Sequence, residues 1–186
     1  MRRILCAVCI SLVAVPSMAL AQGRALGHTV RWDLIRIQQG TALAGGADIA
    51  FHAATGDTFT LTGSGDVKPA TREAAGGGTI VHHIAATNVD FAAIWLVTGF
   101  IDWQPGGGQL PIVDGIGDAS EATGGVLKLA IRILLPSGAV VDAALTVNCH
   151  LPGGTIVDDG IDLSLTGTPF VNMVPHGGAA LFHVQK

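Results

Sequence analysis

The chain has 186 residues, of which 10 are basic and 14 acidic, so its formal net charge is −4 and only 13% of its residues are charged. Lysines and arginines are not clustered, which argues against nucleic acid and against an anionic membrane surface as partners, since both attract gathered cations. The length suits a single domain with a sizeable hydrophobic core.

The first 21 residues have the order of a secretory signal peptide. Two arginines precede an uncharged apolar run over residues 4–15, and small alanines stand one and three residues before Gln22, where a signal peptidase reads them. We therefore expect a signal peptide over residues 1–21, export to the periplasm or the medium, and one domain over residues 22–186. The apolar run is too short to span a bilayer and no stop-transfer segment follows, so we expect no membrane span after cleavage.

Only Cys149 remains after that cleavage, because Cys6 and Cys9 leave with the leader. No intrachain disulfide is then possible, so the exported fold depends on its core. Apolar neighbours on the same predicted strand face favour a small buried Cys149 over a reactive nucleophile.

Beyond the leader, apolar and polar residues alternate with a period of two, punctuated by Gly and Pro, which predicts β-strands. Val30, Trp32 and Leu34 share a face before the apolar set switches to Ile35 and Ile37, and a β-bulge near Leu34 would explain the switch. Further strands are predicted at residues 48–53, 58–62, 79–85, 161–166 and 180–184.

Two longer segments have the clearest patterns. Residues 92–103 are apolar on both faces, which is typical of a strand covered on both sides. Residues 126–151 alternate around a turn at Pro136, Ser137 and Gly138, which predicts a long β-hairpin with one buried face. Glycine runs fit tight turns between about nine strands, and they lie at residues 45–46, 76–78, 106–108, 124–125, 153–154 and 177–178.

Many short strands with Gly and Pro turns indicate an all-β fold. We predict a single-domain antiparallel β-sandwich or small closed β-barrel of about 8–10 strands. An outer-membrane barrel is disfavoured, because aromatic residues make up only 5% of the chain and tyrosine is absent.

Histidine is the only plentiful reactive residue type, with seven copies. His82 and His83 are adjacent on a predicted strand, so their side chains point to opposite faces and cannot share a metal ion. The same alternation sends Cys149 into the core and His150 outward, which argues against a copper site at that pair. No metal-binding motif is present, so we expect no metal and no cofactor.

Two loop segments are further candidates. Asp114, Asp118 and Glu121 share a glycine-rich loop whose carboxylates could bind calcium weakly, although ordinary solvated loop charge explains them as well. Trp103 ends the most apolar strand beside Gly106, where an exposed indole would contact a ligand or partner. The alternative is that Trp103 fills the end of the core.

Several short motifs occur in order along the mature chain. They are Arg31-Trp32-Asp33, Leu61-Thr62-Gly63-Ser64-Gly65, Gly76-Gly77-Gly78-Thr79, Trp103-Gln104-Pro105-Gly106, Cys149-His150-Leu151-Pro152-Gly153 and Leu181-Phe182-His183-Val184. In that order the chain resembles a family of small, often exported bacterial β-rich proteins of unassigned function. The resemblance covers nearly the whole mature chain and implies a single β domain and a bacterial source, without any catalytic residue.

The leading functional hypothesis is a non-enzymatic exported protein that binds an apolar ligand or a protein partner through glycine-rich loops at one end. The candidate contacts are Trp103, His52, His82, His83 and His150. One alternative is a barrel-type enzyme, a hydrolase or a cyclase-like protein, with a pocket of His and Asp side chains. Another alternative is metal binding by histidines.

Overall fold

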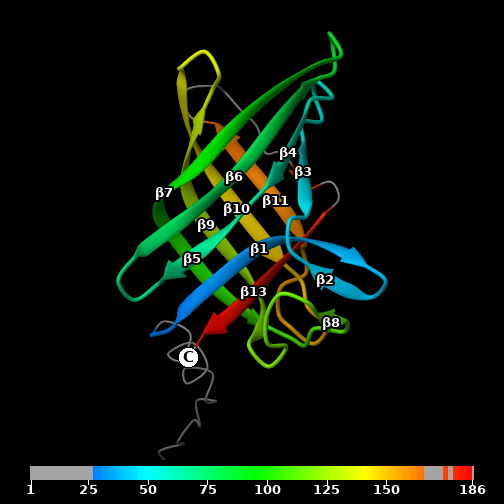
Figure 1. Cartoon of the computed structure of the whole chain (residues 1–186), viewed down its shortest axis with the longest axis vertical. Helices are drawn as coiled ribbons and strands as arrows, with labels where there is room; N and C mark the ends of the chain where they lie inside the picture. The colour runs from blue at the N-terminus through cyan, green and yellow to red at the C-terminus, as the bar shows by residue number, and fades with distance from the viewer. Residues whose placement is uncertain (1–26, 166–173, 176–177, 186) are drawn as a thin grey trace, which may run out of the picture.

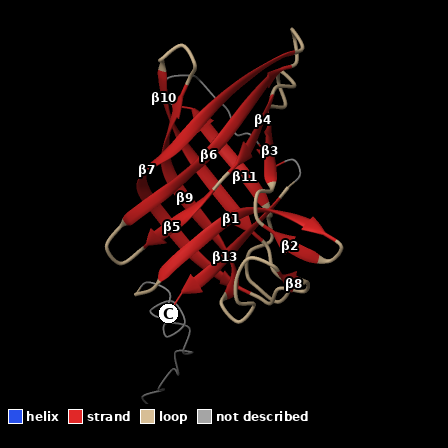
Figure 2. Ribbon diagram, in the orientation of Figure 1, coloured by secondary structure: helices blue, strands red, loops and turns tan. Residues whose placement is uncertain are grey.

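The computed structural model describes residues 27–165, 174–175 and 178–185, and the predicted signal peptide lies outside these ranges. The described chain is all β and contains a closed six-stranded antiparallel barrel with further strands outside it (Figure 2). The predicted all-β class is therefore confirmed, in its barrel form.

The described ranges contain thirteen strands. They are β1 (Thr29–Gln38), β2 (Thr41–Leu43), β3 (Ala47–Phe51), β4 (Thr58–Thr62), β5 (Ser64–Lys68), β6 (Glu73–Ile84), β7 (Val89–Gly107), β8 (Val113–Asp114), β9 (Ala122–Leu134), β10 (Val140–Cys149), β11 (Gly160–Leu165), β12 (Val174–Pro175) and β13 (Ala179–Gln185). The predicted strands at 58–62 and 180–184 coincide with β4 and β13 to within a residue.

The barrel is closed by β1, β5, β6, β7, β9 and β13, each antiparallel to the next, with β13 returning to β1 (Figure 1). Two strands share one edge of β6, because β5 pairs with its first half and β4 with its second half. The sheet continues beyond β9 into β10 and β11, and beyond β4 into β3. Since β3 also lies beside β11, these extensions widen one end of the barrel.

Large aromatic side chains fill the interior of the barrel. Trp32 and Trp95 are fully buried and stack with ring centroids 5.9 Å apart, while Trp103 meets the ring of Phe182 edge-on at 4.8 Å. The indole Nε1 of Trp95 donates hydrogen bonds to the carbonyl oxygen of Thr62 at 3.1 Å and to a second carbonyl on β6. Aromatic burial with a satisfied N–H favours one fixed packing of these strands.

Several glycines lie inside strands, where turns were predicted. The runs at 76–78 and 124–125 belong to β6 and β9, and most of the run at 106–108 belongs to β7. The cause is space: a Cβ at Gly125 would lie 2.3 Å from the ring of Trp103, one at Gly106 would lie 2.4 Å from Ile156, and one at Gly78 would lie 1.9 Å from the carbonyl oxygen of Thr62. These glycines therefore make room for neighbouring side chains and backbone, and the turn interpretation is wrong for these three runs. Part of the predicted turn at 177–178 lies outside the described residues.

The long hairpin predicted over 126–151 is confirmed as β9 and β10, joined by a turn at residues 135–139. Its inward positions on β9 are Leu127, Leu129, Ile131 and Ile133, all at most 4% exposed. On the outer face, Arg132 and Asp142 stand directly opposite each other and form an ion pair of 2.8 Å. The apolar residues of the alternating pattern thus face the interior, and the polar residues between them face outward.

The predicted bulge near Leu34 is wrong. Leu34 and Ile35 are both buried, Ile37 is 59% exposed, and β1 pairs with β13 in continuous register from Thr29 to Ile35. The pattern changes because β1 exchanges its barrel neighbours for β2 from Arg36 onward. Register shifts occur in β7 instead, at three places along its pairing with β9.

Strand β7 is covered on one face only, against the prediction of two covered faces. Trp95 points into the barrel, whereas Ile94 and Leu96 on the opposite face are 52% and 49% exposed. Ile101 is also 41% exposed. The apolar residues on both sides of this strand therefore give a filled interior and an apolar outer surface.

Candidate functional site

A cavity of about 600 Å³ lies at the widened end of the barrel, near the β6–β7 turn and the β9–β10 turn. Figure 1 shows these two turns at the top. Its wall combines positions from β4, β6, β7, β9, β10, β11 and the β9–β10 turn. The lining residues are Phe59, Ile80, His82, Ile84, Phe91, Ala93, Ile133, Leu135, Pro136, Ser137, Val141 and Leu165. All but His82 and Ser137 are apolar, and the volume is within the usual range of about 300–1,000 Å³ for small-molecule sites.

His82 is the titratable side chain among these lining residues. Its ring stacks on Phe59, with centroids 4.2 Å apart and planes 10° from parallel, and its Nε2 lies 3.5 Å from Oδ2 of Asp57. The amide of Ala85 donates to Asp57 at 3.0 Å, and together with the neighbouring imidazole it holds the pKa of this carboxyl below its ordinary value. A carboxylate therefore stands behind the imidazole, at the edge of an otherwise apolar wall.

The structure divides the other predicted histidine contacts among separate places. His83 faces away from the cavity and bonds Asp90 through Nδ1 at 2.7 Å, so the predicted opposition of His82 and His83 is confirmed. His52 is buried and bonds the Thr55 hydroxyl at 2.7 Å in the loop that leads to β4. His150 is exposed after β10, where its ring bonds the carbonyl oxygen of Ile156. Of these four residues only His82 lines the cavity.

Trp103 is not an exposed contact. It is 5% exposed and packs between Phe182 and the glycine backbone at Gly125, at the end of β9 opposite the cavity. The backbone of Thr155 also closes onto Gly106 there, with a hydrogen bond of 2.8 Å. The candidate ligand contact at Trp103 is therefore wrong, and the alternative of a tryptophan filling the core is confirmed.

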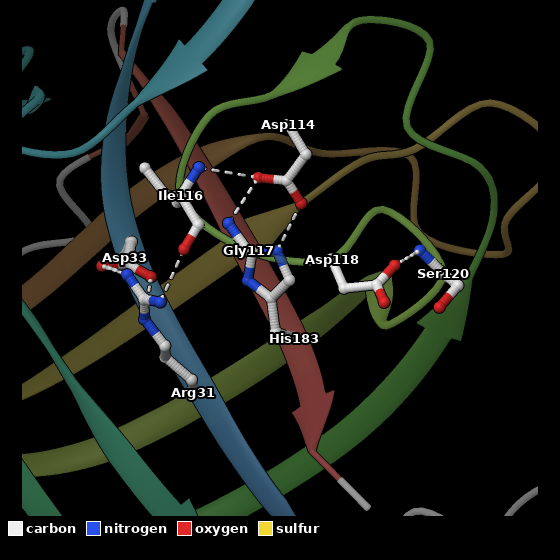
Figure 3. Close-up of polar contacts among 8 residues, drawn as sticks. All are labelled: Arg31, Asp33, Asp114, Ile116, Gly117, Asp118, Ser120 and His183. Atoms are coloured by element: carbon white, nitrogen blue, oxygen red, sulfur yellow. Dashed lines mark hydrogen bonds and ion pairs between the residues drawn. The ribbon is translucent and has the colours of Figure 1, made fainter.

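A buried polar network joins the loop between β7 and β9 to the barrel wall, and the sequence did not reveal it (Figure 3). His183 Nε2 and Asp114 Oδ2 are 2.7 Å apart, with side chains 2% and 3% exposed. The other Asp114 oxygen accepts hydrogen bonds from the amides of Ile116 and Gly117 at 3.0 and 2.9 Å. Arg31 donates to the Ile116 carbonyl oxygen at 2.8 Å and so holds the same loop.

This network fixes the loop through both carboxylate oxygens of Asp114. Burial alone would raise the pKa of Asp114, but hydrogen bonds from His183 and from the two amides bring it below its ordinary value. Arg31 is paired in turn with Asp33 at 2.8 Å. Asp114 is therefore a buried, hydrogen-bonded carboxylate and not a solvated loop acid. Its only sequence signal was a carboxylate beside glycines, far from the histidine that it meets.

Further buried titratable groups lie where β3, β10 and β13 approach one another. Asp48 is 0% exposed, its Oδ2 has no hydrogen-bond partner among the described residues, and burial raises the pKa of this carboxyl to about 7. Cys149 is also 0% exposed, and burial raises the pKa of its thiol to about 12. Asp159 adds a neighbouring negative charge to both, and burial raises its own pKa as well. The predicted burial of Cys149 is confirmed.

Within the described ranges, no three His, Cys, Asp or Glu side chains come together in a way that would hold a metal ion. No helix in the described part of the chain is long and apolar enough to cross a membrane. The candidate site is accordingly the cavity itself, with the Asp57–His82 pair at its edge.

The structure thus defines a small antiparallel β-barrel with an apolar cavity at one end. No family model, no curated protein and no solved structure matches the chain. The resemblance to small exported bacterial β-rich proteins stays a prediction.

Proposed function

We propose that this protein is an exported binding protein for an apolar small molecule, which it holds in the cavity at the widened end of the barrel. The observation that carries the proposal is a volume of about 600 Å³ whose wall is apolar at all but two residues. Transfer of an apolar molecule from water into such a wall is favourable by about 25 cal/mol per Å² of buried apolar surface.

The position of this cavity changes the leading hypothesis. Glycine-rich loops at the Trp103 end are packed against one another through backbone contacts, such as Thr155 to Gly106. The cavity is at the opposite end of β9, where strand residues rather than loop glycines supply the wall. Binding of an apolar ligand therefore stays the proposal, with His82 retained from the predicted contacts.

Two neighbouring alanines on β7 provide a matched test. Ala93 lines the cavity, whereas Ala92 is exposed on the opposite face of the same strand, where it borders a second and more open apolar hollow beside Ile94 and Leu134. We expect the uncharged probe N-phenyl-1-naphthylamine to gain fluorescence on binding the wild-type protein. Ala93→Leu should weaken binding, because the larger side chain occupies part of the cavity, and Ala92→Leu should leave binding in the cavity unchanged.

An equal effect of both alanine variants would place the probe elsewhere, and no fluorescence gain with the wild-type protein would contradict the proposed function. Folding of both variants is checked by circular dichroism and by their urea midpoints. Because Ala93 packs against the core and Ala92 is exposed, the comparison counts only where the urea midpoint shows that Ala93→Leu is fully folded under the binding conditions.

The enzyme alternative is supported by one observation, the pairing of His82 with Asp57 at the cavity edge. A histidine oriented by a carboxylate is suited to act as a general base. The other polar residue among the residues that line the cavity is Ser137, whose hydroxyl oxygen accepts a hydrogen bond from the amide of Ala139 at 3.4 Å. Binding is therefore the better supported function. Hydrolysis of a p-nitrophenyl ester that is lost in His82→Phe and kept in His83→Phe would favour the enzyme.

A further inference from the structure

The cavity presents a ligand with one well-placed polar group, the imidazole of His82. Stacking on Phe59 holds the plane of the ring, and Nε2 is the ring nitrogen that lies toward Asp57, at 3.5 Å from its Oδ2. The other polar lining residue, Ser137, lies in the β9–β10 turn and already accepts a hydrogen bond there. A ligand with a single polar atom therefore gains most by placing it against His82.

The neighbouring carboxylate decides which ring nitrogen carries the proton. Asp57 receives the Ala85 amide, which favours its ionised form, and its Oδ2 lies nearest to Nε2 of His82. The proton of a neutral imidazole is most stable on the nitrogen that faces a carboxylate. Nδ1 of His82 is then an acceptor, and no described residue donates a hydrogen bond to it.

We infer that the ligand is an uncharged, largely apolar molecule with one hydroxyl group, which donates its hydrogen bond to Nδ1 of His82. This inference rests on the proposed function, because it concerns the same cavity. An apolar molecule without a donor would leave Nδ1 unpaired. A carboxylate ligand would bring a second negative charge towards Asp57 and lose its hydration in an apolar wall, which is costly.

Three naphthalene probes of similar size separate these chemistries. They are 2-naphthol, which donates a hydrogen bond, its apolar counterpart 2-methylnaphthalene, and the anion 2-naphthoate. In equilibrium dialysis at pH 7.5 we expect 2-naphthol to bind about 3- to 10-fold more tightly than 2-methylnaphthalene, the usual range for one added hydrogen bond. We expect 2-naphthoate to bind most weakly of the three.

Adjacent histidines provide the matched variants. His82→Phe keeps an aromatic ring on Phe59 but removes Nδ1, so the preference for 2-naphthol over 2-methylnaphthalene should fall to about one, with 2-methylnaphthalene still bound. His83→Phe changes the neighbouring residue on the outer face and should keep the preference. Where His82→Phe does not fold by circular dichroism, Asp57→Asn replaces it, because loss of the carboxylate removes the bias of the proton towards Nε2 and should reduce the same ratio.

The outcomes distinguish this inference from the function beneath it. Equal binding of 2-naphthol and 2-methylnaphthalene by the wild-type protein, or tightest binding of 2-naphthoate, would overturn the hydroxyl assignment while leaving apolar binding intact. A preference for 2-naphthol that survives in His82→Phe would overturn it as well. Failure of all three probes to bind would contradict the proposed function itself.

Discussion

Asp48 is a buried carboxyl whose substitution by Asn should stabilise the protein at high pH and not at low pH. Its side chain is 0% exposed, its Oδ1 accepts a hydrogen bond from the Ile49 amide at 2.7 Å, and no residue in the described part of the chain bonds its Oδ2. Burial, with a smaller contribution from the neighbouring Asp159, raises its pKa from 3.8 to about 7. The folded protein therefore keeps a proton that the unfolded chain releases, so stability falls as pH rises from about 4 to about 7.

The magnitude follows from the two pKa values. A difference between 3.8 and about 7 corresponds to about 4 kcal/mol at 1.36 kcal/mol for each pKa unit, and this is an upper value. The amide that replaces the carboxyl in Asp48→Asn does not ionise, so the difference in unfolding free energy between this variant and the wild type should grow with pH. At pH 4 this ionisation contributes almost nothing, and the free energy of unfolding of Asp48→Asn should be about 1–3 kcal/mol below that of the wild type, because the buried amide is imperfectly paired.

Urea unfolding at intervals from pH 4 to pH 8 measures this difference directly. Asp66→Asn is the control, because Asp66 is exposed on β5. Parallel stability curves for Asp48→Asn and the wild type, or a growing destabilisation of the variant towards pH 8, would refute the reasoning.

Three further predictions concern the packing of the barrel and its network. Gly125→Ala should lower the free energy of unfolding in urea by about 1–3 kcal/mol, because its Cβ would lie 2.3 Å from Trp103. Gly99→Ala is the control: its Cβ would lie 3.7 Å from the nearest atom, so the free energy of unfolding should change by less than about 0.5 kcal/mol. Similar losses in both variants would contradict the steric explanation. Asp114→Asn should lower the free energy of unfolding by about 1–3 kcal/mol at pH 7 and by progressively less below about pH 4. The reason is that the lowered pKa of Asp114 stabilises the fold only while the carboxyl is ionised. Asp118→Asn in the same loop is the control. With Cys6 and Cys9 replaced by Ser, the folded protein should not react with Ellman's reagent at pH 8, because the Cys149 thiol is buried and its pKa is raised to about 12. In urea the same variant should release one equivalent of the coloured thiolate. Rapid reaction of the folded protein would contradict a buried thiol.

The strands with one buried face could be predicted from the sequence, because whether a residue is apolar or polar indicates which face of the strand it occupies. Phe59 and Leu61 on β4 are buried between threonines, as the period of two requires, and the β9–β10 hairpin follows the same rule. The alternation also placed His82 and His83 on opposite faces correctly. Local patterns therefore specified the elements and the side of the sheet on which a candidate residue lies.

Features that depend on distant neighbours could not be predicted in this way. Gly125 looks like a turn residue in the sequence, and only the ring of Trp103 from another strand explains why it lies inside β9. His183 and Asp114 are 69 residues apart and share no motif. Likewise, the apolar second face of β7 gave no indication whether sheet, ligand or solvent would meet it.

The three tryptophans connect the packing of the barrel to its cavity. Trp32 and Trp95 occupy the closed barrel, and Trp103 fills the end of β9 that lies away from the cavity. No tryptophan lines the cavity, where Ile80 on β6 and Ala93 on β7 stand opposite each other. The buried tryptophans pack the same strands that carry the cavity wall, so the wall is held by the core beside it. A site held in this way needs little reorganisation when a ligand enters, which favours affinity for an apolar molecule.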